Sequence, residues 1–163
     1  MPYRYLIFAD IDLLYVEYWG DVTRQDQQDL LSSVIADPRH RFDMAKLVHV
    51  HDVTSTDIGF QDQHELHKRL RTSYEGLAGR VKWVHLAYGD LAFGMARMMQ
   101  SLMSDIEALE IENFRSAREA LDCLGLADTD VGERLGLALE PDASDVADGQ
   151  PLSADAQRDS AGR

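Results

Sequence analysis

Three hydroxyl side chains, Thr54, Ser55 and Thr56, stand together in a short polar stretch. The stretch follows a predicted strand and precedes a predicted helix. Ligands of open α/β sheets usually bind at the carboxyl ends of the strands, where a helix N-terminus offers free N–H groups. A phosphate on Ser55 would add negative charge near that helix end. We therefore predict a ligand-facing, partner-facing or phospho-acceptor loop here, with plain helix capping as the alternative.

Two pairs of histidines have spacings that place their members near each other. His49 and His51 share one face of a predicted strand, and His64 and His67 are three residues apart on a predicted helix. If the pairs met, they could surround a Zn²⁺ ion. Neither spacing is a complete metal signature, and the sequence has no His-Glu-x-x-His motif. We expect no metal and no cofactor, and interpret the histidines as partly buried or surface residues.

A helix predicted from Leu91 to about Asp105 has only a narrow polar strip and carries four of the six methionines. Methionine adapts to irregular or exchanging partners. The helix is therefore either a docking surface, for a dimer or an apolar ligand, or a deeply packed helix with Arg97 reaching solvent. Arg97 could pair with an anion or balance Asp90 or Asp105. The candidate docking or pocket surface comprises Tyr88, Phe93, Met95, Arg97, Met99 and Met103.

No catalytic motif stands in the sequence. It lacks a Gly-x-Ser-x-Gly elbow, a Gly-x-Gly-x-x-Gly turn and a phosphate loop. Cys123 falls in the last predicted helix near Leu121 and Leu124, so it is more typical of a packed residue than of a nucleophile, with nothing nearby that would lower the pKa of its thiol. We expect no catalytic residues, and a protein that is not an enzyme.

Strands and helices that alternate along the chain position these residues. An aromatic-rich pair of strands opens the chain as a hairpin, and strands and helices then alternate. Thr23 to Asp26 and Ser116 to Glu119 have the form of helix capping boxes. Leu109 and Ile111 alternate with glutamates, as in an edge strand. The order β-β-α-β-α-β-α-β-α predicts an α/β fold, with a five-stranded, mostly parallel sheet covered by four helices.

Composition sets further bounds. The chain has 163 residues, 45% of them hydrophobic, and a formal net charge of −13. Such acidity disfavours binding to nucleic acid and to anionic membranes. No apolar run approaches the roughly 20 residues of a membrane span. The first residues lack a signal peptide's pattern, and a single cysteine suits a reducing compartment, so we expect a cytoplasmic protein.

The composition changes after Leu126. Residues 127–163 carry nine acidic and three basic side chains and no aromatic residue. Such a segment buries too little apolar surface to offset its ordering entropy. We predict one domain over residues 1–126 and an acidic, largely disordered tail over residues 127–163. Leu135, Leu137 and Leu139 could still form a short docked piece before Pro141.

The element order and several short strings resemble the SpoIIAA-like group of the STAS superfamily, the anti-anti-sigma-factor-like domains. The strings are residues 18–23 (YWGDVT), 47–52 (LVHVHD), 93–98 (FGMARM) and 117–125 (AREALDCLG). The resemblance covers about residues 3–125. It is greatest to uncharacterised bacterial members of the group.

The resemblance implies a small domain without enzymatic activity, which docks to a protein partner or to itself, or binds a small ligand. In anti-sigma antagonists a phosphorylatable serine follows the third strand, in an Asp-Ser-Ser/Thr-Gly setting. Residues 52–59 (DVTSTDIG) retain hydroxyls, but not that motif. Related folds include lipid-binding CRAL-TRIO domains, which makes an apolar-ligand carrier the second hypothesis. A histidine-based metal protein or unrecognised enzyme is the third.

Overall fold

The computed structural model describes residues 1–137. Its strands are β1 (Tyr3–Phe8), β2 (Leu13–Val22), β3 (Ala45–Thr56), β4 (Val81–Ala87) and β5 (Leu109–Phe114). Its α-helices are α1 (Arg24–Ala36), α2 (Phe60–Tyr74), α3 (Asp90–Leu102), α4 (Ala117–Cys123) and α5 (Val131–Arg134), and a 3₁₀ turn, Ala9–Ile11, joins the first two strands.

The five strands form one sheet in the order β1-β2-β3-β4-β5. β1 pairs with β2 in antiparallel fashion, and the other neighbours are parallel. The predicted α/β architecture with a mostly parallel sheet is therefore confirmed. β5 lies at one edge of the sheet, as the alternation of its apolar residues and glutamates predicts.

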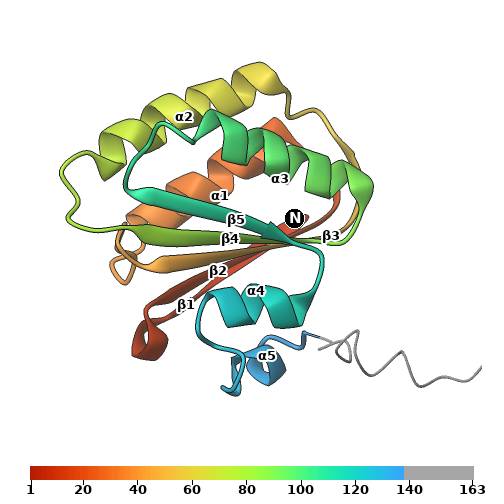
Figure 1. The fold of residues 1–163 in the computed structure, drawn as a ribbon. Coiled ribbons are helices and arrows are strands. Elements are labelled where there is room, and N and C mark those ends of the chain that lie inside the picture. Colours follow the sequence, from red (N-terminus) through yellow and green to blue (C-terminus); the bar gives the residue numbers. More distant parts are fainter. Residues whose placement is uncertain (138–163) are drawn as a thin grey trace, which may run out of the picture.

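Helices cover the two faces of the sheet unequally. α1, α2 and α3 lie on one face, which we call the three-helix face, and α4 and α5 lie on the other (Figure 1). Side chains alternate along β3, so that Val48 packs with residues of α1 whereas Leu47 packs with residues of α4. One strand therefore contributes to two separate layers of side chains.

The beginnings of the helices agree only partly with the sequence. Thr23 caps α1 in a reciprocal capping box with Asp26, as predicted. α2 begins later than expected, with Gly59 as its N-cap and the Asp62 carboxylate accepting from the Gly59 N–H at 2.8 Å. Capping by the stretch from Thr54 to Thr56 is therefore wrong. The end of β2 continues to pair with β3 as far as Thr56. The hydroxyl residues therefore belong to a hydrogen-bonded strand and not to a loop that precedes α2.

The folded region continues beyond residue 126. Val131 of α5 is fully buried, and Leu135 and Leu137 are buried with it in the layer formed around α4. Two of the three leucines expected in a docked piece thus lie in the core, while Leu139 and the rest of the predicted acidic tail lie outside the described residues. Within residues 1–137, no helix is both long and apolar enough to cross a membrane.

Candidate functional site

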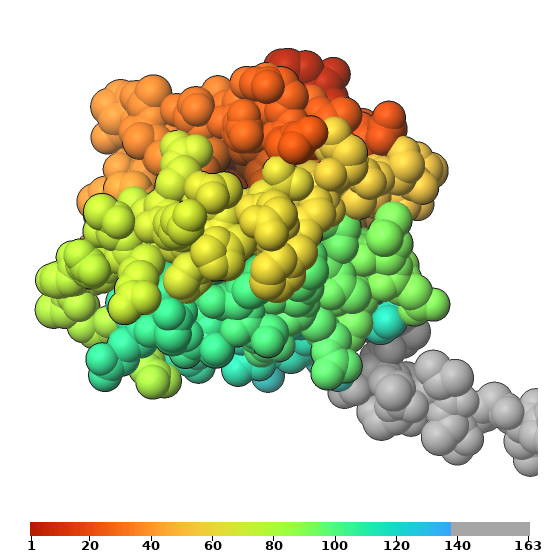
Figure 2. Space-filling model, turned by 90° about the horizontal axis from the view of Figure 1, so that it is seen from above, coloured from red at the N-terminus to blue at the C-terminus, as the bar shows by residue number. Residues whose placement is uncertain are grey.

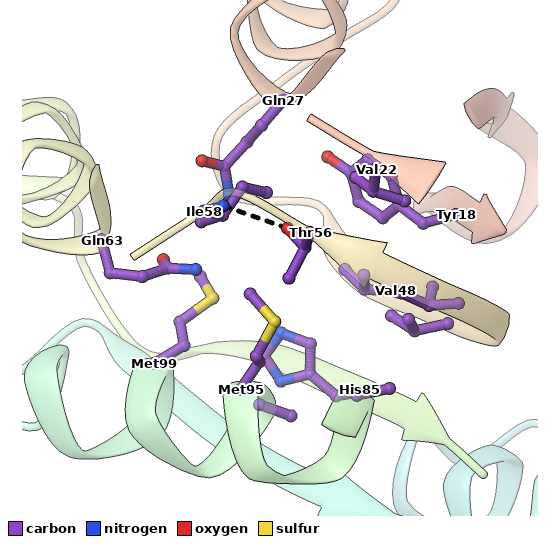
Figure 3. A pocket seen from close by; sticks show the side chains of 14 residues that line it. Tyr18, Val22, Gln27, Val48, Thr56, Ile58, Gln63, His85, Met95 and Met99 are labelled. Atoms are coloured by element: carbon purple, nitrogen blue, oxygen red, sulfur yellow. Dashed lines mark hydrogen bonds between the residues drawn. The ribbon is translucent and has the colours of Figure 1, made fainter. Parts of the chain in front are cut away.

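Two adjoining cavities lie between the sheet and the helices of the three-helix face. The methionine cavity, of about 90 Å³, reaches Met95 and Met99 of α3 (Figure 3). The lysine cavity, of about 100 Å³, reaches Lys46 of β3. Both are lined mainly by apolar side chains. Five residues contribute to both walls: Tyr18, Gln27, Val48, His85 and Met99.

Small and flexible side chains leave this space open. α3 presents Ala92 and Ala96 to the sheet, beside Met95 and Met99. Alanine fills little volume, and methionine adjusts its shape to a neighbouring group. From outside, α1, α2 and α3 lie side by side over the cavities (Figure 2). The arrangement gives an apolar interior whose walls can adapt to an occupant.

A buried cation stands in the wall of the lysine cavity. Lys46 is only 3% exposed, and its ammonium group donates to the carbonyl oxygens of Phe42 at 2.9 Å and Met44 at 2.5 Å. None of the ion pairs among residues 1–137 includes Lys46. Burial lowers the pKa of Lys46 to about 8, so the group is still mostly protonated at neutral pH. A buried cation without a carboxylate is an attractive position for an anion.

Three further buried polar atoms near the cavities have no hydrogen-bond partner within the described chain. They are Tyr74 Oη and Trp83 Nε1, from residues lining the lysine cavity, and Gln63 Oε1, from a residue lining the methionine cavity. Leaving such an atom unsatisfied costs about 1–3 kcal/mol. A ligand with polar groups could satisfy them, and together with Lys46 they offer both donors and acceptors.

His85 lies between the two cavities in a chain of hydrogen bonds. Gln100 donates through Nε2 to the Ile111 carbonyl at 2.7 Å, so its Oε1 accepts from Asn113 Nδ2 at 2.9 Å. Asn113 Oδ1 then accepts from His85 Nδ1, also at 2.9 Å. This order fixes the imidazole as a donor through Nδ1. Burial lowers the pKa of His85 to about 4, which keeps the ring neutral at physiological pH.

The predicted hydroxyl stretch is split between solvent and the cavity. Thr54 and Ser55 are exposed, and Ser55 Oγ donates to the Asp21 carboxylate at 2.6 Å. Thr56 lines the methionine cavity, and its hydroxyl accepts from the Ile58 N–H at 3.1 Å. The three residues belong to β3 rather than to a loop. Modification of Ser55 stays a prediction.

The six residues expected to form one surface are also divided. Met95 and Met99 line the cavity, whereas Met103 is 1% exposed in a core cluster with α2. The Phe93 ring lies under the Arg115 guanidinium at 4.3 Å. Tyr88 is 38% exposed, and its ring meets that of His49 edge-on at 5.5 Å between centres.

Arg97 does not balance either acid proposed for it. Asp90 pairs with Arg115 at 2.9 Å, and Asp105 pairs with His67 at 2.6 Å. Arg97 itself is exposed. The prediction of an Arg97 ion pair with these acids is therefore wrong, because Arg115 and His67 form the ion pairs with them instead.

The sheet separates the two histidine pairs. His49 and His51 lie on the face opposite the three-helix face, where the His49 ring meets Tyr15 of the α4 layer. His64 and His67 belong to α2, on the three-helix face (Figure 1). A metal shared by both pairs is therefore excluded. The register of β2 and β3 brings Glu17 beside His49 instead, a partner that sequence spacing did not indicate.

The backbone arrangement matches a solved structure. An uncharacterized protein of the DUF3478 family from Shewanella loihica PV-4, described as having a SpoIIAA-like fold, superposes with a TM-score of 0.50. It is 17% identical, and the match covers 75% of this chain and 93% of that one. The fold is SpoIIAA-like. This confirms the expected architecture, and identity this low carries the fold alone.

No family model matches the sequence, and no curated protein matches it either. The features of this chain that bear on function are therefore the cavities and side chains of its SpoIIAA-like fold. The residues that distinguish the cavities were mostly missed by motif analysis, because Lys46, Tyr74, Trp83 and Gln63 stand in unremarkable sequence contexts. The methionines of α3 were the one signal that pointed to this region.

Proposed function

We propose that the protein binds a small molecule with an apolar body and an acidic group, such as a fatty acid, in the cavities of the three-helix face. The observation that carries the proposal is Lys46, a buried ammonium without a carboxylate partner in the wall of an apolar cavity. The ammonium would bind the acidic group, and the apolar walls would bury the ligand body.

The polar atoms near the cavities support the same ligand class. Tyr74 Oη and Trp83 Nε1 can donate to a carboxylate that Lys46 holds. Each cavity is smaller than the ~150 Å³ apolar cavity that binds benzene. A fatty acid therefore needs both cavities, together with movement of flexible walls such as Met95 and Met99.

The proposed activity is binding rather than catalysis, in keeping with the resemblance to non-enzymatic domains. Docking to a protein partner or to a second copy is the second proposal. It draws on large apolar side chains that are exposed near the starts of α2 and α3: Phe60 at 54%, Leu91 at 47% and Tyr88 at 38%. These positions do not overlap the lysine cavity, so the two proposals can be tested separately.

Native mass spectrometry of the full chain purified from cells tests both proposals. Retention of a small acidic molecule supports ligand binding, and a dimer mass supports self-association. In vitro, a fluorescent fatty acid should bind the wild type and be displaced by unlabelled fatty acid. Lys46→Met should weaken binding about 10- to 100-fold, the range expected when a hydrogen bond to a charged group is lost.

Lys68→Met provides the matched control, because Lys68 is exposed on α2 and pairs with Glu65 at 3.1 Å. It should bind the fluorescent fatty acid like the wild type. A fatty alcohol of the same length should bind wild type and Lys46→Met equally, since it lacks the charge. Equal fatty-acid affinity in wild type and Lys46→Met would overturn the proposal.

A further inference from the structure

A second cluster of polar side chains lies on the face of the sheet opposite the cavities. Glu17 of β2 is paired in register with His49 of β3, and His51 follows two residues later on the same face. One ligand atom from each of the three side chains lies within 4.8 Å of the other two. Two imidazoles and one carboxylate are a donor set that suits first-row transition metals.

His49 has a buried nitrogen without a partner. The residue is 7% exposed, its Nδ1 lies 2.9 Å from Tyr15 Oη, and its Nε2 has no hydrogen-bond partner in the described chain. When Nδ1–H donates to the Tyr15 oxygen, Nε2 carries an unshared electron pair. A metal ion is one of the few partners that can use such a pair in a buried position.

His51 lies between two carboxylates. Its Nε2 is 2.7 Å from Glu17 Oε1, and its Nδ1 is 3.2 Å from Asp52 Oδ2. Both contacts are hydrogen bonds only when both ring nitrogens carry protons. A cation replacing the Nε2 proton would keep the Asp52 bond. Metal-bound histidines commonly donate their other nitrogen to a carboxylate in this way.

Arg4 holds the remaining oxygen of the carboxylate. Its Nε donates to Glu17 Oε2, which leaves Oε1 facing His51. The guanidinium orients Glu17, but its positive charge opposes a second cation nearby. Arg4 comes from the edge strand β1, and its side chain is about half exposed. Arg4 therefore affects the orientation of Glu17 and the affinity for a cation, but it does not cover the site.

We propose that His49 Nε2, His51 Nε2 and Glu17 Oε1 bind one divalent transition-metal ion, with Zn²⁺ as the probe that tests it. In a tetrahedral zinc site, ligand atoms stand about 3.3 Å apart. The 2.7 Å contact between His51 Nε2 and Glu17 Oε1 must therefore lengthen slightly, whereas the ligand atom of His49 already lies within 4.8 Å of the other two. Three protein ligands leave a fourth position open, as in zinc sites that bind water or an exchangeable ligand.

Zinc titration of the full chain, stripped with chelator, tests the proposal. We expect one tightly bound Zn²⁺ per chain by calorimetry, and visible absorption typical of four-coordinate Co²⁺ when cobalt is used. Glu17→Gln preserves the side-chain shape and should weaken binding more than about 100-fold, beyond the 10- to 100-fold usual for groups that only orient a ligand. His49→Ala should abolish it. Tyr15→Phe, which removes only the partner of His49 Nδ1, should weaken binding about tenfold.

Two further variants separate this site from adventitious binding by other histidines or by surface acids. The double variant His64→Ala/His67→Ala removes a histidine pair on the other face and should bind Zn²⁺ like the wild type. Arg4→Gln removes the opposing charge and should bind about tenfold more tightly. Circular dichroism checks that each variant is folded. If His49→Ala does not fold, the zinc affinity of Glu17→Gln decides the test.

Failure of the stripped wild type to bind Zn²⁺ would overturn the proposal, as would loss of the Co²⁺ signal in the His64→Ala/His67→Ala variant. Unchanged affinity in Glu17→Gln would do the same. None of these results bears on fatty-acid binding, because Lys46 and the cavities lie across the sheet from Glu17, His49 and His51.

Discussion

The ammonium nitrogen of Lys46 lies 5.6 Å from the centre of the Tyr74 ring, beside an otherwise apolar cavity. The ring stabilises the buried cation by a cation–π interaction, and two backbone carbonyls bind it as well. No carboxylate of the described residues forms an ion pair with it; the nearby Asp43 carboxylate pairs with Arg41 instead. This relationship makes the proposed ligand site sensitive to pH.

Fatty-acid affinity should fall as pH rises through about 8. Burial lowers the pKa of Lys46 to that value in the free protein, so above it the amine loses the charge that attracts a carboxylate. Binding isotherms between pH 7 and pH 10 check the expectation. Lys46→Met should show a flat profile over this range, and a profile in that variant as steep as in the wild type would exclude Lys46 as the cause.

Filling the cavities should stabilise the protein and block the ligand. Val48 lines both cavities, so Val48→Ile places its extra methyl group where there is space. We expect a gain of up to about 1 kcal/mol in the free energy of unfolding, the value of one buried methylene, and weaker fatty-acid binding. Urea denaturation and fluorescence titration measure the two effects.

Val84→Ile is the matched control for that change. Val84 is fully buried on the neighbouring strand, in the layer around α4. Overpacking there should destabilise the fold by about 1–3 kcal/mol without a specific effect on ligand affinity. If both valine variants destabilise the protein equally, the space beside Val48 is not available to a ligand.

Acid should destabilise the fold through His85. Burial lowers the pKa of His85 from 6.5 to about 4, so below pH 6.5 the unfolded chain takes up a proton that the folded chain refuses. The stability present above pH 6.5 is then lost as pH falls toward 4, by about 3 kcal/mol for this residue. Urea denaturation at several pH values measures the slope.

His85→Gln isolates that contribution. Glutamine keeps an N–H donor toward Asn113 but does not titrate, so the loss of stability between pH 6.5 and pH 4 should be smaller by roughly the same amount. All other titratable groups are the same in wild type and His85→Gln, so their contributions cancel when the two pH profiles of the unfolding free energy are subtracted. An identical pH slope for the two proteins would show that His85 is not responsible.

Residues beyond 126 should contribute to stability. A chain ending at Leu126 loses Val131, Leu135 and Leu137, each buried against the sheet. Burial of one such side chain is worth roughly 1.5–3 kcal/mol, so this truncation should lower the unfolding free energy by several kcal/mol. A chain ending at Leu137 retains all these contacts and serves as the reference in thermal and urea denaturation. Equal unfolding free energies for the two chains would show that the packing of residues 127–137 does not contribute to stability.

Much of the fold could be predicted from the sequence, because local patterns determine it. The Thr23 capping box, the edge pattern of Leu109 and Ile111, and the alternation of strands and helices each reflect short-range rules that the structure obeys. The start of α2 was missed because β3 extends to Thr56. That extension depends on pairing with β2, which no local pattern reports.

The candidate sites were predicted less well, because their members meet only through the register of the sheet. Glu17 becomes a neighbour of His49 by strand pairing across 32 positions of sequence, and His64 is kept away by the sheet. Lys46 looks like an ordinary exposed lysine in the sequence, and only packing around β3 buries it. The methionines of α3 indicated an adaptable surface, but their spacing did not separate the cavity-lining Met95 from the core residue Met103.

Each strand of the sheet lies beside the strand that precedes it in the chain. The sheet can therefore be assembled one strand at a time as the polypeptide leaves the ribosome, without waiting for a distant segment to be inserted between strands already paired. The face bearing α1 to α3 is completed first, and the opposite face stays uncovered until α4 and α5 emerge. During synthesis, the layer around Tyr15 and Leu47 is consequently the last to be shielded from water and from chaperones.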